Sequence, residues 1–159
     1  MESEIGGLSG EIARTTTDLL ALRTPSVSVL MGQGCGGAAI GLMAGDRVIA
    51  AENSWLSPLP LEGASAIMYR DRSHAAQMAQ SQRVAASQLL ADDIVDVVVP
   101  EDPPQDPQTD PTLCRRIADQ IHTELADLLS TSESKSRRTD SGLVRRGRLR
   151  PTLSTKVKQ

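Results

Sequence analysis

The chain has almost no aromatic residues. Among its 159 residues there are one Trp, one Tyr and no Phe, and hydrophobic residues of all kinds make up 39%. A core must therefore be built from Ala, Leu, Ile, Val and Met. A chain of this length is long enough to form one domain around such a core.

Cysteine and long apolar runs are also scarce. Two cysteines, Cys35 and Cys114, are too few for a disulfide framework and do not have the spacing of a metal site. We therefore expect a reducing, cytoplasmic compartment and no metal. No apolar run approaches the roughly 20 residues that a membrane span needs. The acidic start Met1-Glu2-Ser3-Glu4 has the wrong sign for a signal peptide, so we expect no contact with a membrane.

Positive charge is concentrated in the last part of the sequence. Residues 131–159 contain nine Lys/Arg and two acidic residues, whereas residues 1–130 contain eight basic and eighteen acidic residues. Because residues 131–159 also contain very few apolar side chains, we predict a disordered basic tail after a domain that spans residues 1–130. Nine cations without interleaved aromatic residues favour a solvated arm, or contact with an acidic partner, over nucleic-acid binding.

Apolar β-branched runs alternate with segments of helical spacing. Strands are predicted at residues 27–31, 47–51, 55–56 and 94–99. Helices are predicted at residues 8–22, 36–43, 61–70, 74–82, 85–90 and 111–129. Residues 101–111 are rich in Asp, Pro and Gln and are predicted to form a linker. Alternating strands and helices predict an α/β layered fold.

The most informative segment is the glycine-rich turn at residues 32–37. A β-branched run ends there in GQGCGG, four glycines within six residues, and small residues that favour a helix follow. A strand that stops in glycines and restarts as a helix leaves backbone N–H groups pointing at open space. Such donors bind anions, or stabilise a developing oxyanion, without a charged side chain.

The residues alone leave several interpretations of this turn open. GQGCGG fits G-x-G-x-x-G, and Glu52 follows twenty residues after Gly32, which is the pattern of a dinucleotide-binding turn. The helix of about eight residues is short for the crossover of that fold. Alternatively, the glycines only permit tight packing of strand on helix. Cys35 is either a nucleophile favoured at a helix start or a small buried residue.

The turn and the blocks after it resemble a known enzyme family. Residues 29–40, VLMGQGCGGAAI, are similar to the glycine turn of biotin-dependent acyl-CoA carboxyltransferases, in particular the α-type half of the acetyl-CoA carboxylase carboxyltransferase. The turn is one residue shorter than the family's G-E-G-G-S-G-G. Asp46-Arg47-Val48, the block at 55–67 and the block at 85–101 follow in the family's order and at similar spacing. The resemblance covers roughly residues 6–130.

The resemblance implies a crotonase-like (ClpP/crotonase) α/β fold of repeated ββα units, of which this chain is expected to hold the C-terminal portion. It implies transfer of a carboxyl group from carboxybiotin, held by a separate biotin carboxyl carrier protein, to an acyl-CoA such as acetyl-CoA. It also implies a partner half or subunit that binds the acyl-CoA, and an oligomer. The early ββα units and that half have no counterpart in the sequence, so we expect another chain or segment to complete the enzyme.

The same resemblance assigns roles to individual residues. It implies that the backbone N–H groups of Gly36 and Gly37 form an oxyanion hole for the ureido oxygen of biotin. Loss of one such donor costs about 3–4 kcal/mol. No side-chain base is needed, because biotin itself takes the proton. The other residues assigned to substrate binding are Gly34, Ala38, Glu62 and Gly63. A chain that keeps the fold but acts only as an interaction partner is the remaining alternative, beside an NAD(P)-binding oxidoreductase fragment.

Overall fold

The structure is a computed structural model that describes residues 7–102 and 111–134. Most of the predicted linker, and the predicted basic tail beyond residue 134, lie outside the described residues. The described helices are α2 (Leu8–Ala21), α3 (Gly36–Leu42), α4 (Leu61–Tyr69), α5 (Ala75–Ser81), α6 (Ala86–Ala91) and α7 (Pro111–Ser134). The described strands are β1 (Val27–Leu30), β2 (Gln33–Cys35), β3 (Arg47–Ala51), β4 (Trp55–Ser57) and β5 (Val97–Val99).

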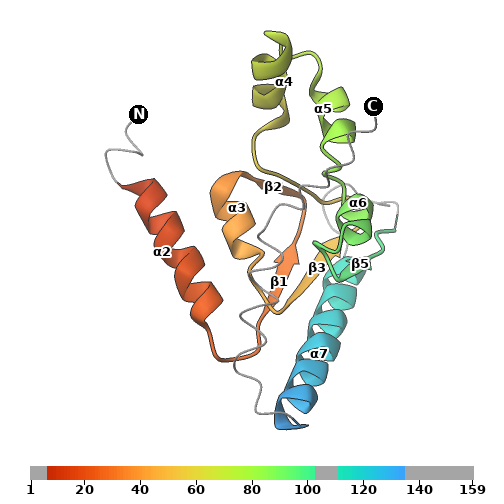
Figure 1. The fold of residues 1–159 in the computed structure, drawn as a ribbon. Helices are drawn as coiled ribbons and strands as arrows, with labels where there is room; N and C mark the ends of the chain where they lie inside the picture. The colour runs from red at the N-terminus through yellow and green to blue at the C-terminus, as the bar shows by residue number, and fades with distance from the viewer. Residues whose placement is uncertain (1–6, 103–110, 135–159) are drawn as a thin grey trace, which may run out of the picture.

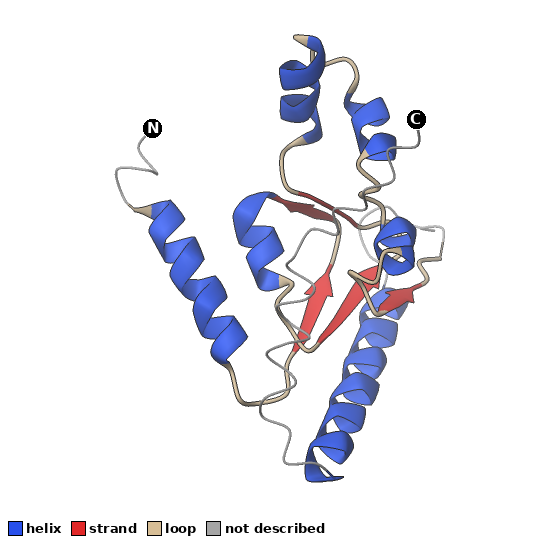
Figure 2. Cartoon of the chain, in the orientation of Figure 1, coloured by secondary structure: helices blue, strands red, loops and turns tan. Residues whose placement is uncertain are grey.

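A parallel three-stranded sheet in the order β1-β3-β5 forms the centre of the fold. Helices flank this sheet, as the layered α/β prediction required (Figure 2). Side chains of a strand point alternately to opposite faces. Accordingly, Val48 and Ala50 belong to one apolar cluster, while Ile49 and Ala51 belong to another. Parallel sheets are normally covered on both faces in this way.

Each face of the central sheet is covered by different helices. On the first face the cluster includes Ala39 and Ile40 of α3 and Ala86 and Leu89 of α6. On the second face α7 lies along the sheet, and its buried Ile117 packs with Ile49 and Val99 (Figure 1). Leu113 and Ile121 flank Ile117 at intervals of four residues and complete this contact. The predicted helix is confirmed, and it continues past residue 129 to Ser134.

A second, parallel sheet of two strands joins β2 to β4. The sequence predicted a turn at residues 32–37, but residues 33–35 form a strand. Gly34 explains this difference, because a Cβ at this position would lie 2.8 Å from Cδ1 of Leu30 and 2.8 Å from Cδ1 of Leu56. The strand can pack here only because its central residue lacks a side chain. The ladder ends at the Cys35–Ser57 pair, because the chain enters α3 at Gly36, the next residue along.

Helix α2 packs on α3 at a site where α3 carries glycine. A Cβ on Gly41 would overlap Oγ1 of Thr16, and a Cβ on Gly37 would lie 3.9 Å from Cγ2 of Ile12. Glycine therefore lets the two helices approach closely. None of the α2 residues is fully buried, so this approach carries much of the contact that holds α2 on the described part of the chain.

We expect the effect of Gly41→Ala on stability to depend on Thr16. In the natural chain the new methyl group overlaps the threonine hydroxyl, which costs about 1–3 kcal/mol and outweighs the gain in helix propensity of about 1 kcal/mol. With Thr16→Ala in place, the overlap is removed and Gly41→Ala should stabilise the protein. Urea unfolding of the single and double variants measures this change of sign. The same effect of Gly41→Ala in both backgrounds would contradict the packing argument.

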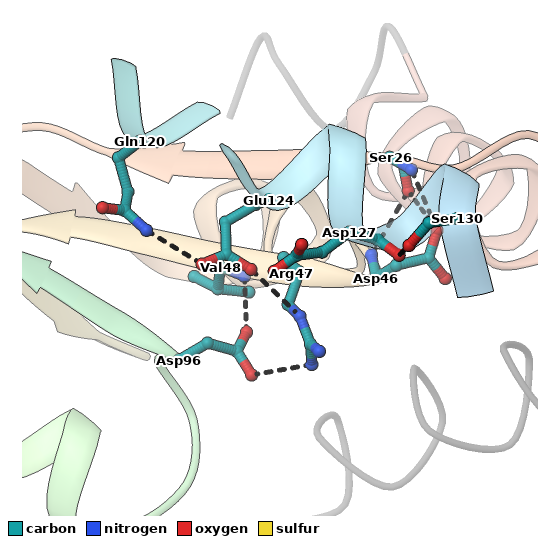
Figure 3. Close-up of polar contacts among 9 residues, drawn as sticks. All are labelled: Ser26, Asp46, Arg47, Val48, Asp96, Gln120, Glu124, Asp127 and Ser130. Carbon is teal, nitrogen blue, oxygen red and sulfur yellow. Dashed lines mark hydrogen bonds and ion pairs between the residues drawn. The ribbon is translucent and has the colours of Figure 1, made fainter. Parts of the chain in front are cut away.

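A polar cluster joins the start of β3 to α7 and to the residue before β5 (Figure 3). Nε of Arg47 lies 3.2 Å from a carboxylate oxygen of Glu124, and Nη1 lies 3.6 Å from one of Asp96. Glu124 also accepts a hydrogen bond of 2.9 Å from Gln120, and Asp96 accepts one of 2.7 Å from the Val48 N–H. The side chain of Glu124 is only 11% exposed. The cluster therefore fixes α7 across the amino-terminal end of the sheet.

Candidate functional site

The glycine-rich turn contains two residues with backbone dihedral angles that favour glycine. Gly32 has φ of +70° before β2, and Gly36 has φ of +80° at the first residue of α3. Other residues rarely adopt such values. Between these two points the chain pairs with β4, and Cys35, immediately before α3, is extended, with φ of −142° and ψ of 141°.

The start of α3 presents backbone donors to open space. The N–H groups in the first turn of a helix have no acceptor within the helix. In α3 these include the N–H groups of Gly37 and Ala38. The N–H of Gly36 is used in the β2–β4 ladder: because Pro58 has no N–H, the parallel Cys35–Ser57 pair requires Gly36 to donate to the carbonyl of Ser57. Gly37 and Ala38 are exposed and Gly36 is half-buried. A Cβ placed on Gly36 would meet nothing within 4 Å. The predicted pair of glycines thus lies at an accessible helix start.

A second helix start lies at the same edge of the small sheet. Because β2 and β4 are parallel neighbours, their carboxyl ends point the same way. β2 leads directly into α3, and β4 leads into α4 through residues 58–60 (Figure 1). Glu62 is exposed in the first turn of α4, where a negative charge is favoured by the helix dipole. Gly63 follows it, half-buried near Pro60. The sheet topology therefore brings both predicted groups of residues, at 36–38 and at 62–63, to one edge.

Gly34 and Ala38 occupy different environments. Gly34 is buried within β2 and packs against Leu30 and Leu56, whereas Ala38 is exposed on α3. The burial and the close contacts of Gly34 indicate that it lets β2 pack closely on Leu30 and Leu56 of the core.

Residues 83–86 form backbone hydrogen bonds with β4 along the edge that faces away from β2. The N–H of Leu56 donates to the carbonyl of Val84 at 2.9 Å, and the N–H of Ala86 donates to the carbonyl of Ser54 at 3.0 Å. Arg83 adopts a positive φ of 54° and forms two hydrogen bonds with Asp92, of 2.8 and 3.0 Å. The Arg83 guanidinium holds the pKa of Asp92 below its ordinary value, first through hydrogen bonding and then through its charge.

We expect Arg83→Gln to raise the pKa of Asp92 toward its ordinary value. A carboxyl group whose pKa is lowered on folding stabilises the protein above its unfolded-state pKa, and this contribution is lost as the pH falls through the folded-state pKa. The melting temperature of the variant should therefore lie below that of the natural chain at neutral pH, and the two should converge in acid. NMR titration of Asp92, with thermal unfolding from pH 7 to pH 2, measures both effects. An unchanged pKa in the variant would contradict this account.

The structure does not support the dinucleotide-binding interpretation. In that interpretation β1 would lead through the glycines straight into a helix. Instead, the middle of the glycine segment forms β2, in a different sheet from β1. Glu52 lies at the end of β3, where its carboxylate accepts the N–H of Glu101 at 2.9 Å. The proposed ribose-binding carboxylate therefore already has a partner within the fold.

The described residues contain neither a metal-binding cluster nor a membrane-spanning helix. Among residues 7–102 and 111–134, no cluster of three or more His, Cys, Asp or Glu side chains is arranged to hold a metal ion. In the same part of the chain, no helix combines the length and the apolar character needed to cross a membrane.

Sequence comparisons agree with the resemblance of the glycine turn and the blocks after it. The family described as acetyl co-enzyme A carboxylase carboxyltransferase-like matches residues 1–142. A probable biotin-dependent acyl-coenzyme A carboxylase beta3 subunit of Mycobacterium tuberculosis (strain ATCC 25618 / H37Rv) is 52% identical over 101 residues, which are 64% of this chain and 20% of that protein. An acetyl-coenzyme A carboxylase carboxyl transferase subunit alpha of Chlorobium phaeovibrioides is 39% identical over 135 residues, 85% of this chain and 40% of that protein. The chain thus spans well under half the length of these relatives.

Solved structures show where the fold recurs. The transcarboxylase 12S structure, described as a hexamer assembly, matches with a TM-score of 0.63 at 19% identity, covering 82% of this chain and 25% of that chain. A chain of a Pseudomonas malonate decarboxylase hetero-tetramer matches with a TM-score of 0.63 at 18% identity, covering 92% of this chain and 60% of that chain. At these identities the likeness is one of fold, and it confirms the predicted crotonase-like α/β class.

Proposed function

Because the chain belongs to the acetyl-CoA carboxylase carboxyltransferase-like family, we propose that it supplies the biotin-facing part of an acyl-CoA carboxyltransferase. The observation that carries this proposal is the pair of helix starts, α3 and α4, at one edge of the β2–β4 sheet. Preformed backbone donors at such a place stabilise negative charge without a catalytic side chain. On this proposal, residues 1–130 are the carboxyltransferase unit and residues 131–159 extend it as a basic tail, whose first four residues complete α7.

The residues at this edge fit a carboxybiotin group. When bound, carboxybiotin would supply the carboxyl group and would take on negative charge at its ureido oxygen. The N–H group of Gly37 would donate to that oxygen, with Ala38 beside it. The other predicted donor, the N–H of Gly36, already donates to the carbonyl of Ser57 in the β2–β4 ladder. The space around Gly36 is open, and no side chain within 4 Å of its Cβ position obstructs an approaching group. Glu62, Gly63 and the backbone of Gly34 would border the same ligand.

We propose that the acyl-CoA is bound by a separate acyl-CoA-binding half, and that biotin arrives on a carrier protein. Acetyl-CoA, giving malonyl-CoA, is the proposed substrate, as the names of the alpha-subunit relatives suggest. Part of the surface suits such a partner. Ile67 is 71% exposed and Met68 is 68% exposed on α4, the same nine-residue helix that carries Glu62 and Gly63 at its start. A half that completes the site at this edge would therefore also cover these apolar side chains.

We expect Ile67→Glu to weaken binding of the acyl-CoA-binding half by 10-fold or more, since a buried charge at an interface costs at least about 1.4 kcal/mol. Leu129→Glu is the matched control, because Leu129 is 54% exposed on α7, away from the β2–β4 edge. Titration of each variant with the acyl-CoA-binding half of a relative measures the difference. Equal binding by the two variants would contradict the proposed contact.

Ligand titrations separate the proposed function from its alternatives. A carboxyltransferase part should not bind NAD, whereas an oxidoreductase fragment should bind it and lose affinity on Glu52→Ala. In the presence of an acyl-CoA-binding half, malonyl-CoA and free biotin, the chain should form acetyl-CoA by the reverse reaction. A folded chain that binds the half and yet gives no acetyl-CoA would favour the alternative of a non-catalytic interaction partner.

A further inference from the structure

Ser57 lies in β4, between the start of α3 and the start of α4. It is the last residue of β4, it is opposite Cys35 in the β2–β4 ladder, and its exposed fraction is 0%. Cys35 immediately precedes α3, and Ser57 is separated from α4 by residues 58–60. Ser57 is therefore paired in the ladder with the residue before one helix start, and three residues separate it in sequence from the other.

The hydroxyl of Ser57 holds the connection from β4 to α4. Its Oγ lies 2.6 Å from the carbonyl oxygen of Leu59, to which it donates, and 3.1 Å from Oε1 of Gln82, just after α5. Pro58 and Pro60 flank Leu59, and neither proline has an N–H to form a hydrogen bond of its own. The serine hydroxyl thus supplies a hydrogen bond in a segment where two of the residues have no backbone donor.

We propose that Ser57 is a positioning residue, which sets the start of α4 relative to the oxyanion-hole donors at the start of α3. This inference rests on the proposed function for its catalytic consequence. Ser57 touches no substrate in this account. It acts through the hydrogen bond to Leu59, and its loss would leave both helices folded while allowing residues 58–63 to move relative to Gly37.

Ser54 provides a matched control in the same region of the chain. Ser54 is 1% exposed, and its hydroxyl donates to the carbonyl of Ala51 at 2.6 Å, the same length as the bond from Ser57 to Leu59. It precedes β4, so it lies at the end of the strand remote from both helix starts. Ser54→Ala and Ser57→Ala remove the same group from equally buried sites, and only Ser57→Ala removes it beside the proposed site.

The first test measures backbone motion in the full chain. We expect Ser57→Ala to lower the NMR backbone amide order parameters of Leu59, of residues 61–63 and of Gly37 from about 0.85 toward about 0.6. Ser54→Ala should leave them unchanged. Unchanged order parameters in Ser57→Ala, or the same fall in both variants, would overturn the proposal. This test does not depend on activity, so it decides the positioning role even if the proposed function is wrong.

The second test measures the reverse reaction with an acyl-CoA-binding half. We expect Ser57→Ala to lower kcat about 10-fold, because small misplacements of catalytic groups are costly, and to raise KM for free biotin. KM for malonyl-CoA should not change, since the partner half binds it. A purely structural role would lower the amount of active enzyme, and so the apparent kcat, without raising KM for free biotin. If the natural chain is active and the two serine variants behave alike, the positioning role fails while the proposed function stands; an inactive natural chain would count against the proposed function.

Discussion

Replacing Gly37 by proline should reduce carboxyl transfer about 10²- to 10³-fold, the cost of losing one oxyanion-hole donor. Proline removes the N–H of Gly37 and little else. Gly37 lies in the first turn of α3 and is not among the described residues with positive φ. Proline is well tolerated at the first turn of a helix. The measurement is the rate of acetyl-CoA formation by the variant mixed with an acyl-CoA-binding half.

Gly37→Ala is the control for this substitution. Alanine keeps the N–H, and its Cβ would lie 3.9 Å from Cγ2 of Ile12, an ordinary contact. It should therefore retain nearly full activity. Full activity in Gly37→Pro, or an equal loss in both variants, would contradict the assignment of the donor. Gly36→Pro is a poorer test, because Gly36 has φ of +80° and proline is restricted to about −65°.

Replacing Arg47 by leucine should lower the free energy of unfolding by about 2–3 kcal/mol. Removal of one member of a buried pair typically costs about 3–5 kcal/mol, and the value is smaller here because the Arg47 side chain is 41% exposed. The variant leaves the carboxylate of Glu124, 11% exposed, without its cation and near Asp96. For a domain of this size the melting temperature should fall by about 2–4 °C per kcal/mol.

The double variant Arg47→Leu, Glu124→Leu separates the unpaired charge from the lost contacts. With both charges gone, much of the stability should return, because apolar replacement of a buried pair is often neutral. Asp96 keeps its hydrogen bond of 2.7 Å from the Val48 N–H in both variants. Urea unfolding measures the free energies. A double variant less stable than Arg47→Leu alone would show that the pair stabilises the fold by more than charge compensation.

The central sheet was predictable because burial on both faces leaves a clear pattern. The run at residues 47–51 is apolar after Arg47, and the structure places it in the centre of the sheet. The strand at 94–99 was predicted too long. Ile94 and Val95 do pack on the core, but Asp96 turns its carboxylate to the Val48 N–H, and the strand begins at Val97. The Val48 N–H thus bonds the Asp96 side chain, 48 residues away in the sequence, in place of a backbone carbonyl, although the Asp96 N–H still donates to the Val48 carbonyl at 2.8 Å.

Strand β2 could not be predicted from local sequence. Gln33, Gly34 and Cys35 have little preference for a strand, and they pair only because Trp55, Leu56 and Ser57 lie beside them. The helix start at Gly36 was predictable, since the glycine-rich segment follows a strand and small residues that favour a helix come after it. That the N–H groups there stabilise an oxyanion stays a prediction. The proposed role of Ser57 was not predictable, because it depends on the pairing of Ser57 with Cys35 in β2, a strand that the sequence did not predict.

The reverse reaction tests the central proposal most directly. Malonyl-CoA and free biotin would be incubated with this chain alone, with an acyl-CoA-binding half alone, and with both, and acetyl-CoA would be followed over time. We predict biotin-dependent acetyl-CoA formation only when both proteins are present, and its loss in Gly37→Pro but not in Gly37→Ala. No acetyl-CoA from the mixture, with the chain folded and bound to the half, would contradict the proposal that this chain supplies the biotin-facing site.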